Sequence, residues 1–450
     1  MDRNTFWRLG TALPLVLSCI VLADCGGNKT TTTALPPTAI AAKRYVVGGT
    51  FDTGFSGGAV TTKIDPSEYE YALAVALQSG KIIATGHSVL AGQGVIALVR
   101  YNADGSLDTA FGTSGIVRTA VPSVNAVATA VVVQPGALPA NDKILVAGST
   151  FDPSTGTAGI VLARYTATGT LDAGFGTGGQ GFVSAPIGPG TSVDNASLAL
   201  QGGNIVVAGA TSAGDFVLRR YNSAGVLDPN FGTAGTATTH VGPSAMGPAI
   251  ALQSDGKIVA AGASGGFASP PMNAVLVRYT IDGTLDTTFG GAAGNGMVFT
   301  DTVPSSNNFA NAVAVQTPGD KIVVAGHAFV DFAADTSDIA LLRYNADGTP
   351  DTGFGTNGTG AVVTNLGAFD NAFSVALYPD PDNRIVVSGN TGSGVAVSAA
   401  VLRFTALGAL DPTFGTGGIV TTSPTGPSTA ASANAVLVQP GGSIVVVGYD

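Results

Sequence analysis

A repeated pattern constrains this chain more than any other feature of the sequence. The order Arg, aromatic, three residues, Gly, two residues, Asp, two residues, Phe occurs seven times, with its arginines 56 to 65 residues apart. The arginines are Arg44, Arg100, Arg164, Arg220, Arg278, Arg343 and Arg403, and an Asp follows each by eight residues. A period of this length indicates one repeat architecture rather than two or three unrelated domains.

Each repeat contains four short stretches rich in Val and Ile, which we name strands A to D. In one repeat they are residues 310–316, 321–326, 339–344 and 360–364. Turn residues such as Asn102-Ala103-Asp104-Gly105 separate strands C and D, and such residues are typical of tight hairpins. Strand B ends in Gly in all seven repeats, and no helical period is sustained. Each repeat therefore predicts a four-stranded antiparallel meander.

The two ends of the repeat region are complementary. Arg44 lies in a first unit that has strands C and D only, and the last unit stops at Asp450 after strand B. In a ring the two halves pair into one blade and leave no strand edge open. The sequence therefore predicts an all-β fold, a seven-bladed β-propeller of four-stranded antiparallel blades over residues 39–450, closed by pairing N-terminal strands C and D with C-terminal strands A and B.

The repeats, with strings such as "VQTPGDKIVVAG" and "ALLRYNADGTPDTGFGTNG", resemble the delta-60 repeat family of bacterial envelope and secreted proteins. The resemblance implies propeller-like units and an unknown function, and it covers residues 39–450. The first copy departs from the pattern, because Ser56 stands where the others have Gly after Phe.

The N-terminus predicts export. An apolar run over residues 9–23 precedes Leu22-Ala23-Asp24-Cys25, which resembles a lipoprotein signal with lipidation at Cys25. We expect a signal peptide over residues 1–24, a flexible tether over 25–38, and a lipid-anchored protein at the cell envelope. The alternatives are lipidation at Cys19, or cleavage after Ala23 to give a secreted or periplasmic soluble protein. These two cysteines are the only ones, so no intramolecular disulfide is expected in the mature chain.

Charge limits the partners. The net charge is −10 and only 11% of residues are charged, so the chain lacks the basic surface that nucleic acid requires. We expect no nucleic acid partner, contact with a membrane only through the N-terminal lipid, and a monomer that binds an unknown protein or carbohydrate ligand.

The recurring residues predict structural roles, because a side chain present in every blade does not create the asymmetry of an active site. We expect each Arg and Asp to form a structural pair or a turn cap, and each Phe to pack between neighbouring blades. The recurring hairpin Gly is expected to need a positive φ. The spacing of Asn102, Asp104 and Asp108 resembles that of a calcium-binding loop, so calcium is one candidate cofactor. The alternative is that these residues only form an Asx-type turn. No other cofactor is expected.

The candidate binding residues lie in the variable B–C and D–A loops, which share one face of a meander. This loop face carries carboxylates and two histidines at equivalent positions after strand B. The candidates are Glu68, Glu70, His87, Asp301, His327, Asp331, Asp335 and Asp338. They predict an acidic face that recognises cations, amines or basic partners, and a metal or general-base role for the histidines is the less favoured interpretation.

No nucleophile elbow, phosphate loop or zinc signature is present in the sequence. The sequence therefore predicts a non-catalytic binding or scaffold module with no catalytic residues. Two alternatives remain: an extracytoplasmic hydrolase or lyase that acts on a polymer at the mouth of the central channel, and a structural or adhesion component.

Overall fold

The computed structural model describes residues 38–187, 196–266, 269–291, 294–302, 306–331, 336–367, 369–379, 381–393, 396–424 and 430–450. The predicted signal peptide, Cys25 and almost all of the predicted tether lie outside these residues. Within them, the helical elements are three 3-10 turns, η2 (Ser56–Gly58), η3 (Pro139–Asn141) and η4 (Thr177–Gly179). No helix in this part of the chain is both long and apolar enough to cross a membrane.

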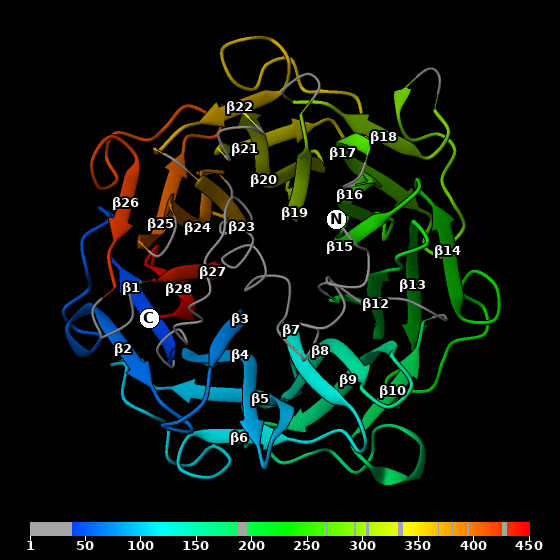
Figure 1. The fold of residues 1–450 in the computed structure, drawn as a ribbon, viewed down its shortest axis with the longest axis vertical. Helices are drawn as coiled ribbons and strands as arrows, with labels where there is room; N and C mark the ends of the chain where they lie inside the picture. The colour runs from blue at the N-terminus through cyan, green and yellow to red at the C-terminus, as the bar shows by residue number, and fades with distance from the viewer. Residues whose placement is uncertain are drawn as a thin grey trace, which may run out of the picture.

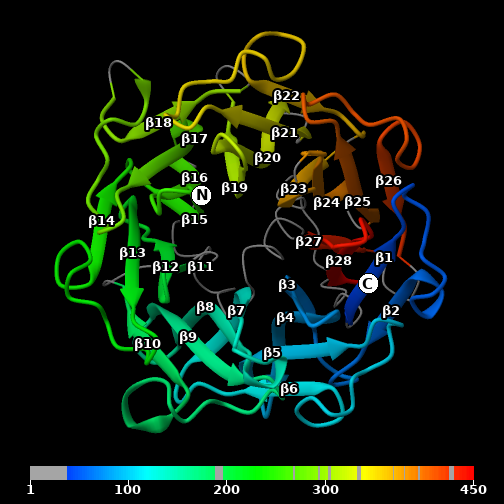
Figure 2. The same cartoon turned by 180° about the vertical axis from the view of Figure 1, so that it is seen from behind.

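The described chain is otherwise built of antiparallel sheets arranged around a common axis (Figure 1; Figure 2 from behind). Four sheets have four strands that follow one another in sequence: β3 (Tyr71–Gln78), β4 (Lys81–Leu90), β5 (Gln93–Tyr101) and β6 (Ile116–Thr119); β7 (Asn125–Gln134), β8 (Lys143–Asp152), β9 (Thr157–Thr166) and β10 (Phe182–Pro186); β11 (Ser197–Gln201), β12 (Asn204–Ala210), β13 (Asp215–Tyr221) and β14 (Thr236–His240); β15 (Ala245–Leu252), β16 (Ile258–Gly266), β17 (Ser269–Tyr279) and β18 (Met297–Thr300). In these four repeats the predicted four-stranded antiparallel meander is therefore confirmed.

A fifth sheet joins the two ends of the described chain. Its order is β2 (Ala59–Thr62), β1 (Ile40–Tyr45), β28 (Ile444–Tyr449) and β27 (Ser432–Val438). Strand β1 pairs antiparallel with β28 from Ile40 opposite Tyr449 to Tyr45 opposite Ile444.

The remaining repeats differ from the expectation of separate four-stranded sheets. They form one eight-stranded sheet from β19 (Asn308–Gln316), β20 (Lys321–Asp331), β21 (Thr336–Tyr344), β22 (Ala361–Thr364), β23 (Phe369–Leu377), β24 (Ile385–Ser393), β25 (Ala396–Phe404) and β26 (Ile419–Thr422). The connection between its two halves is a parallel pairing of Ser337 with Phe369, because β23 begins beside the start of β21.

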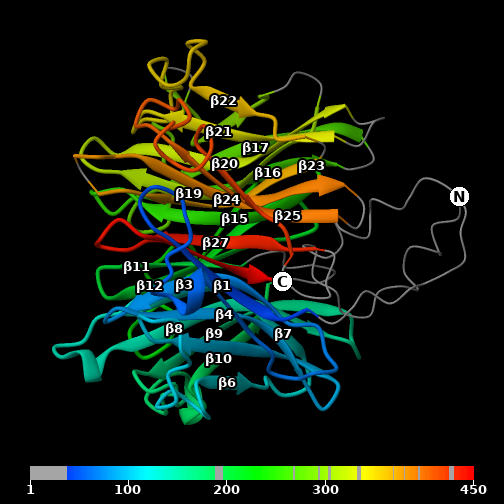
Figure 3. The same ribbon diagram turned by 90° about the vertical axis from the view of Figure 1, so that its left-hand side faces the viewer.

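The hydrophobic core lies between neighbouring sheets. One cluster, for example, packs Ile96 and Leu98 of β5 against Val146 of β8 and Val161 of β9, all fully buried. Because both faces of each sheet are covered, strands B and C are apolar on both sides. The strands run between two faces of the molecule (Figure 3).

In six of the seven repeats, the Gly that ends the strand B run is required by the strand opposite it. Strand A carries a bulge opposite it, as between Ala72 and Ala74 in β3. The bulge brings a carbonyl so close that a Cβ on Gly86 would stand 2.0 Å from the carbonyl oxygen of Tyr71. A Cβ on Gly389 would likewise stand 1.7 Å from that of Asn371. Only Gly fits at this position.

Candidate functional site

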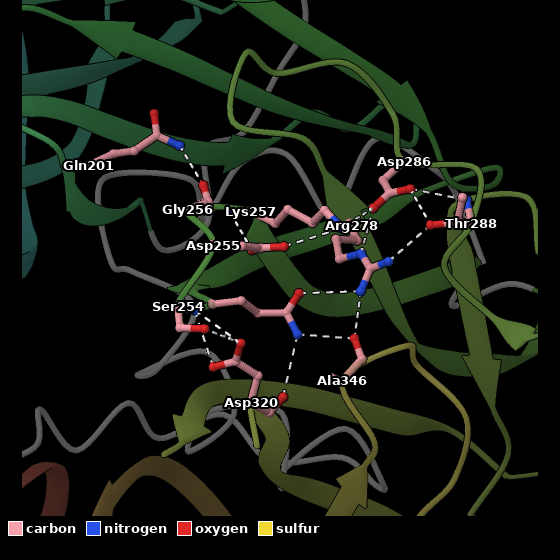
Figure 4. Close-up of polar contacts among 11 residues, drawn as sticks. Gln201, Ser254, Asp255, Gly256, Lys257, Arg278, Asp286, Thr288, Asp320 and Ala346 are labelled. Atoms are coloured by element: carbon pink, nitrogen blue, oxygen red, sulfur yellow. Dashed lines mark hydrogen bonds and ion pairs between the residues drawn. The ribbon is translucent and has the colours of Figure 1, made fainter. Parts of the chain in front are cut away.

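The recurring Arg and Asp form ion pairs in all seven repeats. Each Arg lies on strand C, its Asp follows the C–D hairpin, and the N–O distances are 2.7 to 2.9 Å. The side chain of Arg278 shows the arrangement (Figure 4). Its Nε donates to Asp286 at 2.9 Å, and its Nη2 donates to the hydroxyl of Thr288 at 3.2 Å.

Each Arg also binds the next repeat. Its Nη1 donates to a backbone carbonyl in the following C–D hairpin, and the acceptors are Ala103, Ala167, Ser223, Ile281, Ala346, Ala406 and Val47. The last contact runs from Arg403 to Val47, between the end and the start of the repeat region. The predicted structural role of the Arg–Asp pairs is thus confirmed.

The recurring Phe stacks under the Arg of its own repeat, with 4.2 to 4.9 Å between the guanidinium carbon and the ring centroid. Its other contact is the hairpin Gly of the next repeat. Gly348 has a φ of +87°, and a Cβ added to it would stand 2.6 Å from the ring of Phe289. The predicted packing of Phe between blades and the positive φ of the hairpin Gly are both confirmed. In the first repeat, Ser56 donates its hydroxyl to the carbonyl of Asp104 in the next one.

Six of these carboxylates have a lowered pKa, namely Asp108, Asp172, Asp228, Asp286, Asp351 and Asp411. Burial alone would raise the pKa of Asp286, but hydrogen bonds from Thr288 and the charges of Arg278 and Lys257 outweigh it and lower that pKa to about 2. A permanently charged, paired carboxylate holds the sheets together and is poorly suited to transfer protons.

The loop face contains a different kind of carboxylate. Glu70 is fully buried at the start of β3. It accepts hydrogen bonds from the backbone N–H of Ile64 and Asp65 at 2.6 and 2.7 Å, and from the hydroxyl of Ser88 at 3.1 Å. Burial raises its pKa despite these bonds. Glu70 therefore closes the loop that precedes β3 instead of presenting its charge to solvent.

His87, on the neighbouring strand β4, lies opposite Tyr71 in the register of β3 and β4. Their rings are stacked, with centroids 5.3 Å apart. Burial lowers the pKa of His87 to about 4 and raises the pKa of Tyr71. The Tyr71 hydroxyl and His87 Nδ1 are both buried and make no hydrogen bond to the described residues. Unsatisfied buried polar atoms are rare enough to require an explanation.

His327 occupies the equivalent position on β20, but its neighbour is Phe309, with ring centroids 4.6 Å apart. Its Nδ1 lies 3.1 Å from Nδ2 of Asn311, and burial lowers its pKa to about 4. Each histidine is therefore enclosed by the aromatic ring of its own repeat, and the structure does not bring the two together.

Asp338 on β21 is buried beside a second carboxylate, Asp370 on β23. Asp338 accepts a hydrogen bond from Asn365 at 2.6 Å. Asp370 is fully buried and bound by the N–H of Leu366 at 2.6 Å and by Thr391. Burial, together with the charge of Asp338, raises the pKa of Asp370. Asp370 and Glu70 occupy equivalent positions at the start of strand A.

The other candidates are scattered. Glu68 is half-buried, and its backbone carbonyl accepts a hydrogen bond from Lys63 at 2.9 Å. Asp301 is exposed and accepts a hydrogen bond from Asn308 at 2.9 Å. The backbone of Asp331 pairs with Thr336 at the end of β20, and Asp335 lies outside the described residues. No group of three or more metal-binding side chains occurs in the described part of the chain.

Sequence reasoning missed Tyr71 and Asp370. Tyr71 precedes an apolar strand and resembles a core residue, and its contact with His87 depends on the pairing of β3 with β4. Asp370 was missed because it precedes its strand B glycine, Gly389, by 19 residues, whereas Glu70 precedes Gly86 by 16. Only the strand register makes the two positions equivalent.

Six segments of the chain match the family model described as "Domain of unknown function (DUF5122) beta-propeller": residues 77–111, 140–175, 203–231, 253–289, 319–354 and 381–414. Each segment contains a strand B, a strand C and the Arg–Asp–Phe pattern. The match supports the propeller-repeat part of the resemblance noted above. No curated protein matches the chain.

Several solved structures are similar in fold. The polysaccharide lyase Uly1 is 11% identical, with a TM-score of 0.44 over 92% of this chain and 99% of that chain. An α-L-arabinofuranosidase from Fusarium graminearum is 12% identical, with a TM-score of 0.44 over 73% of this chain and 92% of that chain. Sqt1 from Chaetomium thermophilum is 12% identical, with a TM-score of 0.40 over 84% of this chain and 92% of that chain.

These comparisons contradict the prediction of a non-catalytic module. Two of the three similar structures are enzymes. The absence of a known catalytic motif was by itself too weak a ground for that prediction. A catalytic site is recognised by the geometry and chemistry of its residues on the fold and not by a short motif alone. At these identities the likeness concerns the fold, so the function has to be argued from the residues of this chain.

Proposed function

We propose that this chain is an extracytoplasmic hydrolase or lyase that acts on a polymer at the loop face, with His87 and Tyr71 as its proton-transfer groups. The observation that carries the proposal is that two buried polar atoms on a pair of stacked rings, His87 Nδ1 and the Tyr71 hydroxyl, have no partner among the described residues. A substrate or a water molecule that binds between the loops would supply the missing hydrogen bonds.

The protonation states define which of the two groups would accept a proton and which would donate one. With a pKa of about 4, His87 is neutral at neutral pH and has a lone pair that can accept a proton. The raised pKa of Tyr71 keeps its hydroxyl protonated, so Tyr71 can donate. In a hydrolysis, His87 would take the proton of water and Tyr71 would protonate the departing oxygen. In an elimination, His87 would instead take a carbon-bound proton next to a carboxylate, and a double bond would form as the C–O bond breaks.

The chain provides a matched control for this proposal. His327 has the same position and the same lowered pKa, but Phe309 replaces the tyrosine and Asn311 contacts its Nδ1. The test measures release of reducing ends from a panel of acidic and neutral polysaccharides, and ultraviolet absorbance of unsaturated products to detect elimination. We expect His87→Asn and Tyr71→Phe to lower turnover by about 10²-fold or more, and His327→Asn to leave it unchanged.

Two outcomes would count against this proposal. One is that no polymer in the panel is cleaved by the wild-type protein. The other is that His327→Asn lowers turnover as much as His87→Asn, because the effect would then come from the fold rather than from the site.

A second candidate site is the carboxyl pair of Asp338 and Asp370. Glycoside hydrolases commonly use two carboxyl groups as catalytic groups, one of them with a raised pKa. In this pair the pKa of Asp370 is raised. Asp370→Asn tests it against the matched variant Glu70→Gln, since both side chains bind the loop before strand A. Loss of turnover in Asp370→Asn alone would place the reaction at this pair and not at His87.

We further propose that the propeller is a closed ring of seven blades. Three contacts support this: the β1–β28 pairing, the hydrogen bond from Arg403 to Val47, and the packing of Phe414 against Gly49. The single parallel pairing of Ser337 with Phe369 supports counting the eight-stranded sheet as two blades. The apolar run over residues 9–23 and the Leu22-Ala23-Asp24-Cys25 pattern support our proposal that the chain is exported and lipidated at Cys25.

A further inference from the structure

The face opposite the loop face has a cavity at the axis. It has a volume of about 480 Å³ and lies where the inner strands of four neighbouring repeats end. This volume lies within the range of about 300–1,000 Å³ that is usual for small-molecule sites. None of the carboxylates or histidines discussed above lines it.

The cavity is largely apolar. Its walls include the last aliphatic residue of each of four inner strands, Leu77 of β3, Val315 of β19, Leu377 of β23 and Val438 of β27, all partly exposed. The three remaining inner strands carry Val133, Leu200 and Leu252 at the equivalent position, and these do not line the cavity. The cavity is therefore a local feature and not a consequence of the repeat.

The lining side chain of Gln439 departs from a hydrogen-bonding pattern that four repeats share. At the end of strand A, Gln78, Gln201, Gln253 and Gln316 each accept a hydrogen bond from the Arg of their own repeat. Gln439 has the equivalent position, but its side chain makes no hydrogen bond to the described residues. Arg44, the Arg of that repeat, binds Asp52 and the carbonyl of Ala103 instead. The Gln439 amide thus remains available at the edge of an apolar cavity.

The lining also determines which charge a ligand can carry. The described lining contains aliphatic, proline, amide, hydroxyl and phenol groups but no charged side chain. A charged ligand group would lose hydration here without gaining a counter-charge, which is unfavourable. We propose that this cavity binds a small, uncharged, mainly apolar molecule with one hydrogen-bonding group, which the Gln439 amide recognises.

The test is a fluorescence titration of the full protein with N-phenyl-1-naphthylamine, an uncharged apolar amine. The charged comparison is 1-anilinonaphthalene-8-sulfonate, which has the same rings and an added sulfonate. We expect saturable binding of the uncharged probe, with an affinity at least tenfold higher than that of the sulfonate. Leu377→Gln should weaken binding of the uncharged probe at least tenfold, and the matched variant Leu200→Gln should leave it unchanged.

Binding without saturation, equal affinity for both probes, or equal weakening by the two variants would overturn the proposal. If circular dichroism shows that Leu377→Gln does not fold, Val438→Phe replaces it, because the larger ring fills the cavity and the same tenfold weakening is expected. The readout is binding and the cavity is on the face opposite His87, so the result is independent of the catalytic proposal.

Discussion

Replacing His327 with Asn should remove a defined part of the acid sensitivity of this fold. His327 is 8% exposed, and burial holds its pKa at about 4 against 6.5 for the free side chain. Its Nδ1 faces Nδ2 of Asn311, which also donates to the carbonyl of Ala372 at 2.7 Å. Since the Asn311 nitrogen is held as a donor, Nδ1 acts as an acceptor, and a proton placed there would lose this hydrogen bond.

The direction in which pH changes the free energy of unfolding follows from the two pKa values of His327, folded and unfolded. Between about pH 4 and pH 6.5 the unfolded chain binds a proton at His327 and the folded chain does not, so the free energy of unfolding falls as the pH falls. The contribution of His327 is fully present above pH 6.5. With 1.36 kcal/mol per pKa unit, lowering the pH from about 7.5 to 5 costs about 2 kcal/mol at this residue.

Urea unfolding at the two pH values measures this difference. It is followed by circular dichroism, because the only tryptophan, Trp7, lies in the predicted signal peptide. We expect wild-type protein to lose about 2 kcal/mol more than His327→Asn between the two conditions. Asn is a suitable replacement because Asn390 occupies the equivalent position in another repeat. His240→Asn, a change at an exposed histidine, should behave like wild type. Equal losses in wild type and His327→Asn would refute the reasoning.

Two further predictions concern the repeat contacts. Arg403→Met should lower the free energy of unfolding by about 3–5 kcal/mol, because it leaves buried Asp411 without its main partner; a loss below about 1 kcal/mol in urea unfolding would contradict this. Gly389→Ala should cost about 1–3 kcal/mol or more, since its Cβ would stand 1.7 Å from the Asn371 carbonyl oxygen. Gly441→Ala, where no atom lies within 4 Å of the added Cβ, is the control, and similar melting temperatures for the two variants would argue against the bulge explanation.

Part of the candidate site could be predicted from sequence and part could not. Glu70 and His87 were identified as residues of the loop face, and the structure places Glu70 directly before β3 and His87 on β4, opposite Tyr71. We predicted that Glu70 carries an exposed charge. In the structure, hydrogen bonds from Ile64, Asp65 and Ser88 enclose its carboxylate instead. Loop conformation decides such contacts, and no spacing in the sequence encodes it.

By itself the sequence determined the repeat, its four strands and the roles of its Arg, Asp, Phe and hairpin Gly. These depend on short-range spacing, and each copy repeats the same contacts, so a single pattern is sufficient to find them. Only the tertiary structure decided that Tyr71 stacks on His87 and that four inner strands enclose a cavity beside Gln439. Those features depend on bulges, on strand register and on the few positions where one repeat departs from the others. What such positions contact is determined by packing across the molecule and not by the local sequence pattern.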